Sequence, residues 1–175
     1  NRDVFVHDIL TGETSLVSAT SEGIVANAHS SHPSISANGR FVAFHSGADT
    51  LVADDMNGSL DIFVHDRQSG ETTRVSLASD GSQSNNHSFY PTLSTDGRYV
   101  AFTSTADNLV PGDTNGIEDI FVHDRQTGAT TRVNVDSLGL SYIDVVVISA
   151  DGRFVAFDFD FFEVYVHDRY TGETD

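Results

Sequence analysis

The 175-residue sequence contains no cysteine, no lysine and no tryptophan. Without cysteine, the chain cannot build a disulfide framework, a thiol nucleophile or a zinc–thiolate site. Without lysine, it cannot be a Schiff-base enzyme, and it lacks the amine of a Walker-type phosphate loop. The missing residue types therefore exclude several large enzyme classes.

Positive charge is also scarce, because nine arginines face 26 aspartates and glutamates, which gives a net charge of −17 at pH 7. Such a chain repels phosphate backbones, so we expect no nucleic acid partner. No apolar run approaches the ~20 residues of a membrane-spanning helix, so we expect no membrane-spanning segment. The hydrophobic content of 38% is nevertheless sufficient for a buried core.

Three motifs recur along the chain in the same order and phase. The pattern [DE]-x-[FY]-V-H-D occupies residues 3–8, 61–66, 119–124 and 163–168. The pattern S-x-[DN]-G-R-[FY]-V-A-F occupies residues 36–44, 94–102 and 149–157. A Thr-Gly or Ser-Gly turn occupies residues 11–12, 69–70, 127–128 and 171–172. Self-similarity of this kind indicates a repeat architecture.

Each repeat predicts four short strands, which in the first complete unit cover residues 33–36, 40–44, 61–65 and 72–76. Consecutive apolar residues in the second and third strands indicate sheets that are covered on both faces, and no segment has helical spacing. Four-stranded antiparallel sheets stacked in this way are the blades of a β-propeller. We therefore expect an all-β chain of about three blades. A β-solenoid is the alternative, although a repeat of this length is long for one coil.

The motifs D-I-F-V-H-D-R-x-T-G-x-T-T-R-V and P-x-[IL]-S-x-[DN]-G-R-[FY]-V-A-F resemble the TolB-like, WD-repeat-like propeller repeat of bacterial envelope and secreted proteins. The resemblance covers residues 3–133 closely and residues 144–173 with deviations. It implies a propeller, commonly six-bladed, in the periplasm or outside the cell. It implies fold more firmly than function, because such propellers host unrelated roles.

The phase of the motifs divides the chain into a partial blade (1–27), two blades (28–85 and 86–140) and an incomplete blade (141–175) that stops before its fourth strand. Three blades do not close a ring, which leaves blade faces and strand edges open. Three interpretations follow. The chain is part of a longer polypeptide, two copies close a six-bladed ring, or copies associate end to end into a filament.

The last repeat departs from the pattern, since its loop between the second and third strands is shorter and Val146 replaces a proline. Terminal repeats are often atypical because they face a different neighbour. We expect an end or interface blade, with an adhesive surface if its phenylalanines are exposed. These phenylalanines are Phe157, Phe159, Phe161 and Phe162.

The two long loops between the second and third strands share the pattern D-x-N-G-x-x-D, whose oxygen-bearing residues are typical calcium ligands. They are Asp55, Asn57 and Asp61 in one loop, and Asp113, Asn115 and Asp119 in the other. We predict a Ca²⁺ site in each loop. The alternative is an Asx turn in which the last aspartate only begins the next strand.

Histidine occurs in two settings. The Val-His-Asp triplet is present in every repeat, and because catalysis needs a residue once, we interpret it as structural. His29, His32 and His87 lie in loops that would reach the central channel, where propellers often bind ligands. No G-x-S-x-G hydrolase motif is present, so we assign no catalytic residue.

Together, these observations predict a non-catalytic propeller module that acts outside the cytoplasm and binds a protein or small ligand, or serves in structural assembly. One alternative is a self-assembling extracellular fibre or surface subunit, formed through blade faces and open strand edges. The other is the propeller portion of an exported hydrolase whose catalytic domain lies elsewhere.

Overall fold

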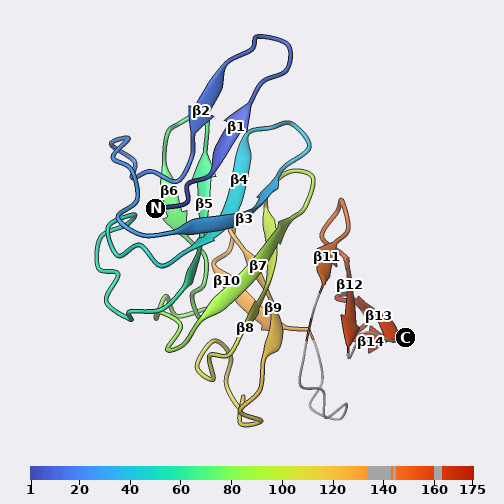
Figure 1. Cartoon of the computed structure of the whole chain (residues 1–175). Helices are drawn as coiled ribbons and strands as arrows, with labels where there is room; N and C mark the ends of the chain where they lie inside the picture. The colour runs from blue at the N-terminus through green and yellow to red at the C-terminus, as the bar shows by residue number, and fades with distance from the viewer. Residues whose placement is uncertain (134–142, 144, 160–162) are drawn as a thin grey trace.

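The computed structural model describes residues 1–133, 143, 145–159 and 163–175. These residues form a two-stranded ribbon followed by three four-stranded antiparallel sheets (Figure 1). The described residues contain no helix, and thus none that could cross a membrane. The all-β propeller-blade prediction is confirmed.

The sheets follow one another along the chain, and each is built from strands that are consecutive in sequence. The N-terminal ribbon consists of β1 (Phe5–His7) and β2 (Thr14–Leu16). Blade 1 consists of β3 (Ser30–Ile35), β4 (Phe41–Ser46), β5 (Asp61–Asp66) and β6 (Thr72–Arg74). Blade 2 consists of β7 (Ser88–Leu93), β8 (Tyr99–Ser104), β9 (Asp119–Asp124) and β10 (Ala129–Arg132). Blade 3 consists of β11 (Val146–Ile148), β12 (Phe154–Phe159), β13 (Glu163–Asp168) and β14 (Glu173–Thr174).

The middle strands of each complete blade are buried on both faces, as their unbroken apolar runs predict. Every residue of β5 and β9 is buried. Ala43 lies opposite Val64 and Ala101 lies opposite Val122, and both alanines are fully buried. A methyl side chain at this position lets the next blade approach closely.

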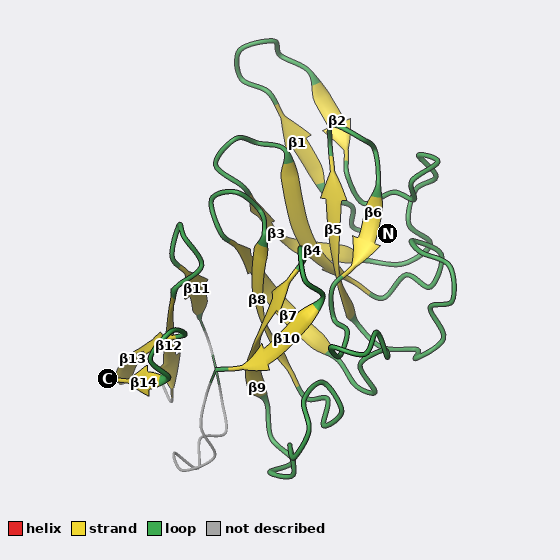
Figure 2. Cartoon of the chain, turned by 180° about the vertical axis from the view of Figure 1, so that it is seen from behind, coloured by secondary structure: helices red, strands yellow, loops and turns green. Residues whose placement is uncertain are grey.

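The blades stack face to face, and the innermost strands of neighbouring blades lie next to each other. Strand β7 lies next to both β3 and β11, although each of the three belongs to a different sheet. Apolar side chains of blades 1 and 2 form one core, and those of blades 2 and 3 form a second. A third core joins the N-terminal ribbon to blade 1. Figure 2 shows the ribbon and the three blades in this order.

Blade 3 differs from the sequence prediction in two respects. The sequence placed no fourth strand before residue 175, whereas Glu173 and Thr174 form the short strand β14 and pair with β13. Phe157 is 2% exposed because it packs against blade 2, so it is not part of an adhesive surface. The side chains of Phe159, Phe161 and Phe162 lie outside the described residues.

Candidate functional site

The Val-His-Asp triplet makes the same contacts in successive blades. Asp66 accepts two hydrogen bonds from Arg40, with Nε–Oδ1 and Nη2–Oδ2 distances of 2.9 and 2.6 Å. Asp66 also accepts from the backbone N–H of Gln68, and these bonds, above all those from Arg40, hold the pKa of its carboxyl well below the usual range. Nδ1 of His65 lies 2.9 Å from Oγ1 of Thr72. The equivalent arginine–aspartate pairs are Arg98–Asp124 and Arg153–Asp168.

Because each blade uses the triplet in the same way, these residues hold the blade together. The equivalent histidine–threonine pairs are His7–Thr14, His123–Thr130 and His167–Thr174. The geometry therefore favours the structural interpretation of the triplet.

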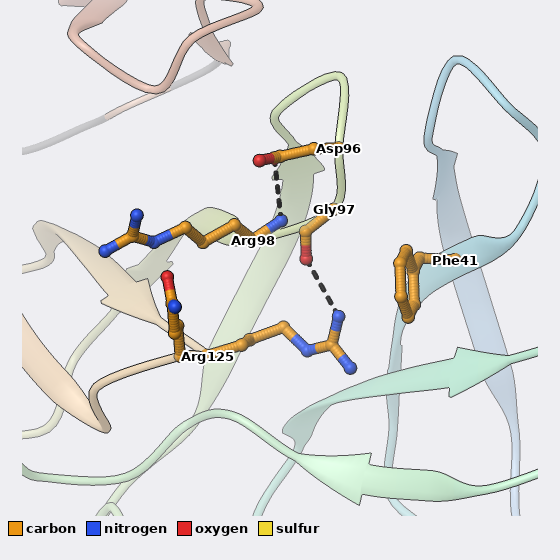
Figure 3. Close-up of a pocket in the computed structure, with 6 residues that line it drawn as sticks. Phe41, Asp96, Gly97, Arg98 and Arg125 are labelled. Atoms are coloured by element: carbon orange, nitrogen blue, oxygen red, sulfur yellow. Dashed lines mark hydrogen bonds between the residues drawn. The ribbon is translucent and has the colours of Figure 1, made fainter.

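A cavity of about 320 Å³ lies where the hairpin of one blade meets its neighbour (Figure 3). Nη1 of Arg125 donates to the carbonyl oxygen of Gly97 at 2.8 Å, and its guanidinium lies 4.5 Å from the centre of the Phe41 ring. Gly97 has φ +72° and lies so close to Phe41 that a Cβ atom would come within 2.7 Å of the ring carbon Cγ. We call this arrangement the glycine–arginine latch.

The latch recurs between blades 2 and 3. There, Arg169 donates to the carbonyl oxygen of Gly152, and its guanidinium lies 4.5 Å from the centre of the Tyr99 ring. A Cβ atom on Gly152 would come within 2.7 Å of Cγ of Tyr99. A cation over an aromatic face is favourable, and here it joins two sheets. The cavity is therefore part of the blade-to-blade contact.

The residues predicted to bind calcium come together around an arginine. Nη1 of Arg74 lies 2.9 Å from Oδ1 of Asp55 and 3.8 Å from Oδ2 of Asp61. Nδ2 of Asn57 donates to Asp61 at 2.8 Å, while Oδ1 of Asn57 accepts from the backbone N–H of Ser59, which closes an Asx turn. A guanidinium thus supplies positive charge between the two carboxylates.

Blade 2 has the same cluster, in which Nη1 of Arg132 lies 3.1 Å from Asp113 and 3.4 Å from Asp119, and Asn115 donates to Asp119. Burial, reinforced by the neighbouring carboxylate, raises the pKa of Asp55 and of Asp113. Within the described residues, no three His, Cys, Asp or Glu side chains are grouped so as to hold a metal ion.

Calcium binding at these loops stays a prediction. An ion that binds only the folded state stabilises it, so removing the ion lowers the melting temperature. We therefore expect EDTA to lower the Tm and excess CaCl₂ to restore it. Thermal melting in the two conditions measures this. An unchanged Tm in EDTA would contradict calcium binding at these loops.

The innermost strands of blades 1 and 2 carry matching bulges beside a proline. Pro33 and Pro91 have no N–H group to donate to the neighbouring strand. The pairing shifts there, and the preceding residues, His32 and Tyr90, have φ of 52° and 50°. In blade 3, Val146 replaces the proline and pairs regularly with Phe157. Left-handed backbone is strained for bulky residues, and such strain is typical of functional sites.

These two bulges carry a group of rings that we call the inner-strand cluster. The ring centres of His32 and Tyr90 are 4.9 Å apart, and those of His32 and His45 are 4.6 Å apart. Phe89 lies 5.9 Å from Tyr90 and 6.0 Å from His45. The cluster is completed by Val145, which is 49% exposed. Thus residues from three blades meet on one surface.

The cluster borders a cavity of about 240 Å³ that is mostly apolar. It is lined by His32, Pro33, Tyr90, Pro91, Val145 and Val146. Aromatic rings and prolines offer a rigid apolar surface with a few polar atoms, which suits recognition of a ligand or a partner side chain.

The other two loop histidines of the sequence prediction are structural. Nδ1 of His29 accepts from the backbone N–H of Arg2 at 2.8 Å. Nδ1 of His87 accepts from the backbone N–H of Leu60 at 2.9 Å. Each therefore ties its loop to the segment that leads into β1 or β5. Of the three predicted channel histidines, His32 lies in the cluster and His87 borders it, because the ring centres of His87 and Phe89 are 5.9 Å apart.

His45 was missed by the sequence analysis because it follows the recurring V-A-F segment without being part of the motif. Its Nε2 atom lies 2.8 Å from Oγ of Ser31 and 3.2 Å from Nδ1 of His32. Burial, and secondarily the charge of His32, lower the pKa of His45 to about 4. The only signal for His45 in the sequence is its position directly after V-A-F, where the equivalent residue of blade 2 is Thr103.

The lowered pKa of His45 predicts loss of stability in acid. The folded protein binds the proton more weakly than the unfolded chain, so the stability is fully present above pH 6.5 and is lost as the pH falls toward 4. We expect His45→Thr to reduce the loss between pH 7 and pH 4.5 by roughly 2 kcal/mol, allowing for solvent screening. Urea denaturation at both pH values measures it. Equal losses in the two proteins would contradict the prediction.

No protein-family pattern and no curated protein matches the sequence. Solved structures do match the fold. TolB from Acinetobacter baumannii is 20% identical with a TM-score of 0.58, over 99% of this chain and 37% of that one. A putative TolB from Agrobacterium tumefaciens is 19% identical with a TM-score of 0.53, over 94% of this chain and 52% of that one.

Two further solved structures are also similar in fold. One is the β-propeller domain of the trilobed protease from Pyrococcus furiosus, 17% identical with a TM-score of 0.54, over 85% of this chain and 41% of that one. The other is an oligogalacturonate lyase in complex with manganese, 16% identical with a TM-score of 0.62, over 99% of this chain and 41% of that one. The chain spans about a third to a half of the length of each similar structure.

These likenesses agree with the stacked four-stranded blades and with the recurring V-H-D and G-R-[FY]-V-A-F motifs. The chain therefore has the fold of the TolB-like β-propellers.

Proposed function

We propose that this chain is a non-catalytic propeller module that binds a protein partner at the inner-strand cluster and acts in the periplasm or outside the cell. The observation that carries the proposal is the matched strain at His32 and Tyr90. Two bulky residues keep a left-handed backbone at equivalent positions, and both border the same cavity. Backbone strain of this kind clusters at sites that bind ligands or partners.

The likeness to TolB structures supports the location, because the resemblance of the repeat implies export. A non-catalytic role is supported by the histidines and aspartates of the Val-His-Asp triplets, because their side chains contact a threonine or an arginine of their own blade. The partner contacts that we propose are apolar and aromatic, with one imidazole.

The proposal predicts that Tyr90 contributes to binding more than to stability. In Tyr90→Gly, relief of backbone strain offsets the loss of a ring that is 39% exposed, so the free energy of unfolding should change by less than about 1 kcal/mol. Phe102→Ala, which empties a fully buried position, should cost about 3–5 kcal/mol. Urea denaturation measures both. If Tyr90→Gly lost as much unfolding free energy as Phe102→Ala, Tyr90 would be shown to serve packing and not binding.

Binding itself is tested with a photo-crosslinking amino acid at position 90 in cells that produce the chain. We expect a defined protein adduct at this position and none from position 170, where Tyr170 is 72% exposed but lies in the turn between β13 and β14. Identical adducts from both positions, or none from either, would contradict the proposal.

A second candidate function is the propeller portion of an exported hydrolase. The likeness to a propeller domain of a protease favours it. A nucleophile motif such as G-x-S-x-G elsewhere in the native polypeptide would select this function over the first.

A further inference from the structure

We infer that His32 and His45 of blade 1 form a binding site for one divalent transition-metal ion of the class that imidazole prefers, such as Zn²⁺ or Cu²⁺. The two histidines belong to the inner-strand cluster and lie on the neighbouring strands β3 and β4. The inference does not rest on the proposed protein partner, because it concerns the purified chain and metal ions alone.

The separation of the two rings is that of ligands to one ion. Nδ1 of His32 and Nε2 of His45 lie 3.2 Å apart, and Oγ of Ser31 lies 2.8 Å from the same Nε2 atom. Two imidazole nitrogens that bind one ion through bonds of about 2.0–2.1 Å lie about 2.9–3.4 Å apart, for square-planar to tetrahedral angles. The nitrogens therefore have the spacing of neighbouring ligands, and the Ser31 hydroxyl supplies an oxygen beside them.

The strained bulge of β3 brings the two histidines together. Ser31 pairs with His45 across the sheet, so in a regular strand the next residue would point to the opposite face. At the bulge, where His32 has φ +52°, its ring turns to the same side and contacts His45. Bulges re-aim side chains in this way next to functional sites. The strain at His32 is therefore accounted for by the contact that it creates.

The histidine pair is particular to blade 1. The equivalent positions are occupied by Tyr90 and Thr103 in blade 2, and by Val145 and Asp158 in blade 3. The V-A-F segment before the second position is nevertheless the same in all three blades. A contact that the blade needs for folding recurs in every blade, whereas a binding site is needed once. The other two blades form the same sheet without the pair, so the fold does not require it.

His45 is better suited to bind an ion than to serve packing. Its side chain is 7% exposed, yet its Nδ1 atom has no hydrogen-bond partner among the described residues. Buried polar atoms nearly always have a partner, so a threonine, as in blade 2, would serve the fold better. Burial, and secondarily the charge of His32, lower the pKa of His45 to about 4. The ring is thus neutral at pH 7, which is the form that binds a metal.

The surroundings of the pair admit a cation. His32 is exposed and lines the cavity of about 240 Å³, whereas His45 forms the closed side of the site. No arginine is among the described residues that line this cavity. The net charge of −17 raises the concentration of cations around the chain. An ion can therefore enter from the cavity, and water fills the positions that the protein leaves open.

Isothermal titration calorimetry of the metal-free chain with ZnCl₂ and with CuCl₂ tests the inference. We expect one tightly bound ion per chain, with Cu²⁺ bound more tightly than Zn²⁺ and Mn²⁺ at least tenfold more weakly than Zn²⁺. His32→Asn and His45→Thr should each lower the Zn²⁺ affinity at least tenfold, and both changes together should add little. Asparagine tolerates the left-handed backbone, and threonine is the residue of blade 2, so both variants should fold.

His29→Asn is the matched control. It removes a histidine from the same segment but keeps a side-chain acceptor for the backbone N–H of Arg2, so Zn²⁺ should bind normally. Excess CaCl₂ should not displace Zn²⁺, which separates this site from the acidic loops. Unchanged Zn²⁺ affinity in His32→Asn or His45→Thr would overturn the inference, as would an equal loss in His29→Asn.

Electron paramagnetic resonance of the unmodified chain with one equivalent of Cu²⁺ gives a second readout that needs no variant to fold. We expect coupling of the copper to two imidazole nitrogens. Any other number of nitrogens would overturn the assignment to this pair, and so would the absence of saturable binding by both metals.

Discussion

Replacing Gly97 with alanine should destabilise the protein by about 2–4 kcal/mol, whereas the same change at Gly39 should cost about 1 kcal/mol. The two glycines have nearly equal φ, +72° and +70°, so the backbone penalty is shared. Only at Gly97 would the new methyl group collide with the Phe41 ring, in the contact that joins blades 1 and 2. Urea denaturation of the two variants isolates the steric part of the latch.

Gly152→Ala repeats the test at the second latch, where the methyl group would meet the Tyr99 ring. We expect a loss like that of Gly97→Ala. Equal losses in Gly39→Ala, Gly97→Ala and Gly152→Ala would show that the ring contact in the latch adds no stability beyond that of the left-handed turn.

Replacing Arg74 with methionine should cost about 3–5 kcal/mol, because it leaves two buried carboxylates without their counter-charge. The side chains of Asp55 and Asp61 are 5% and 0% exposed, and that of Arg74 is 8% exposed. Chemical denaturation at pH 7 measures the loss. Arg153→Met, which breaks a pair whose arginine is 38% exposed, is the control and should cost much less.

The Arg74→Met loss should also depend on pH. The Arg74 charge lowers the pKa of Asp55, so its removal raises further a pKa that burial already raises. A carboxyl with a raised folded-state pKa stabilises the fold below its unfolded pKa, and this stability is lost as the pH rises through the folded value. The variant should therefore lose less at pH 5 than at pH 7, and Asp55→Asn in the same chain should restore part of the loss. A pH-independent loss would mean that Arg74 acts through packing alone.

The sequence predicted the blades because each blade is local. All four strands of a blade are consecutive in the chain, and their limits are set by Asn-Gly and Asp-Gly turns and by β-branched and aromatic runs. Gly39 at φ +70° and the Asn38 side chain, which accepts from the backbone N–H of Arg40, form the turn between β3 and β4. The alanine of V-A-F recurs in each of the three blades, and Ala43 is fully buried where neighbouring sheets approach closely.

Contacts between blades could not be predicted from the sequence, because they join residues 58 or 84 positions apart and depend on the angle at which the sheets stack. The Arg125 guanidinium lies over the Phe41 ring only when blade 2 lies on blade 1. Likewise His32 and Tyr90 meet because two bulges of different sheets lie side by side.

The sequence by itself determined the repeat, the four strands of each blade and the turn chemistry, since these depend on neighbours within a few tens of residues. The tertiary structure alone decided that an arginine lies between the carboxylates of the two acidic loops. It also decided that His45 joins the inner-strand cluster. The reason is that charge, ring and edge contacts become specific only after the stacking of the sheets fixes which side chains share a surface.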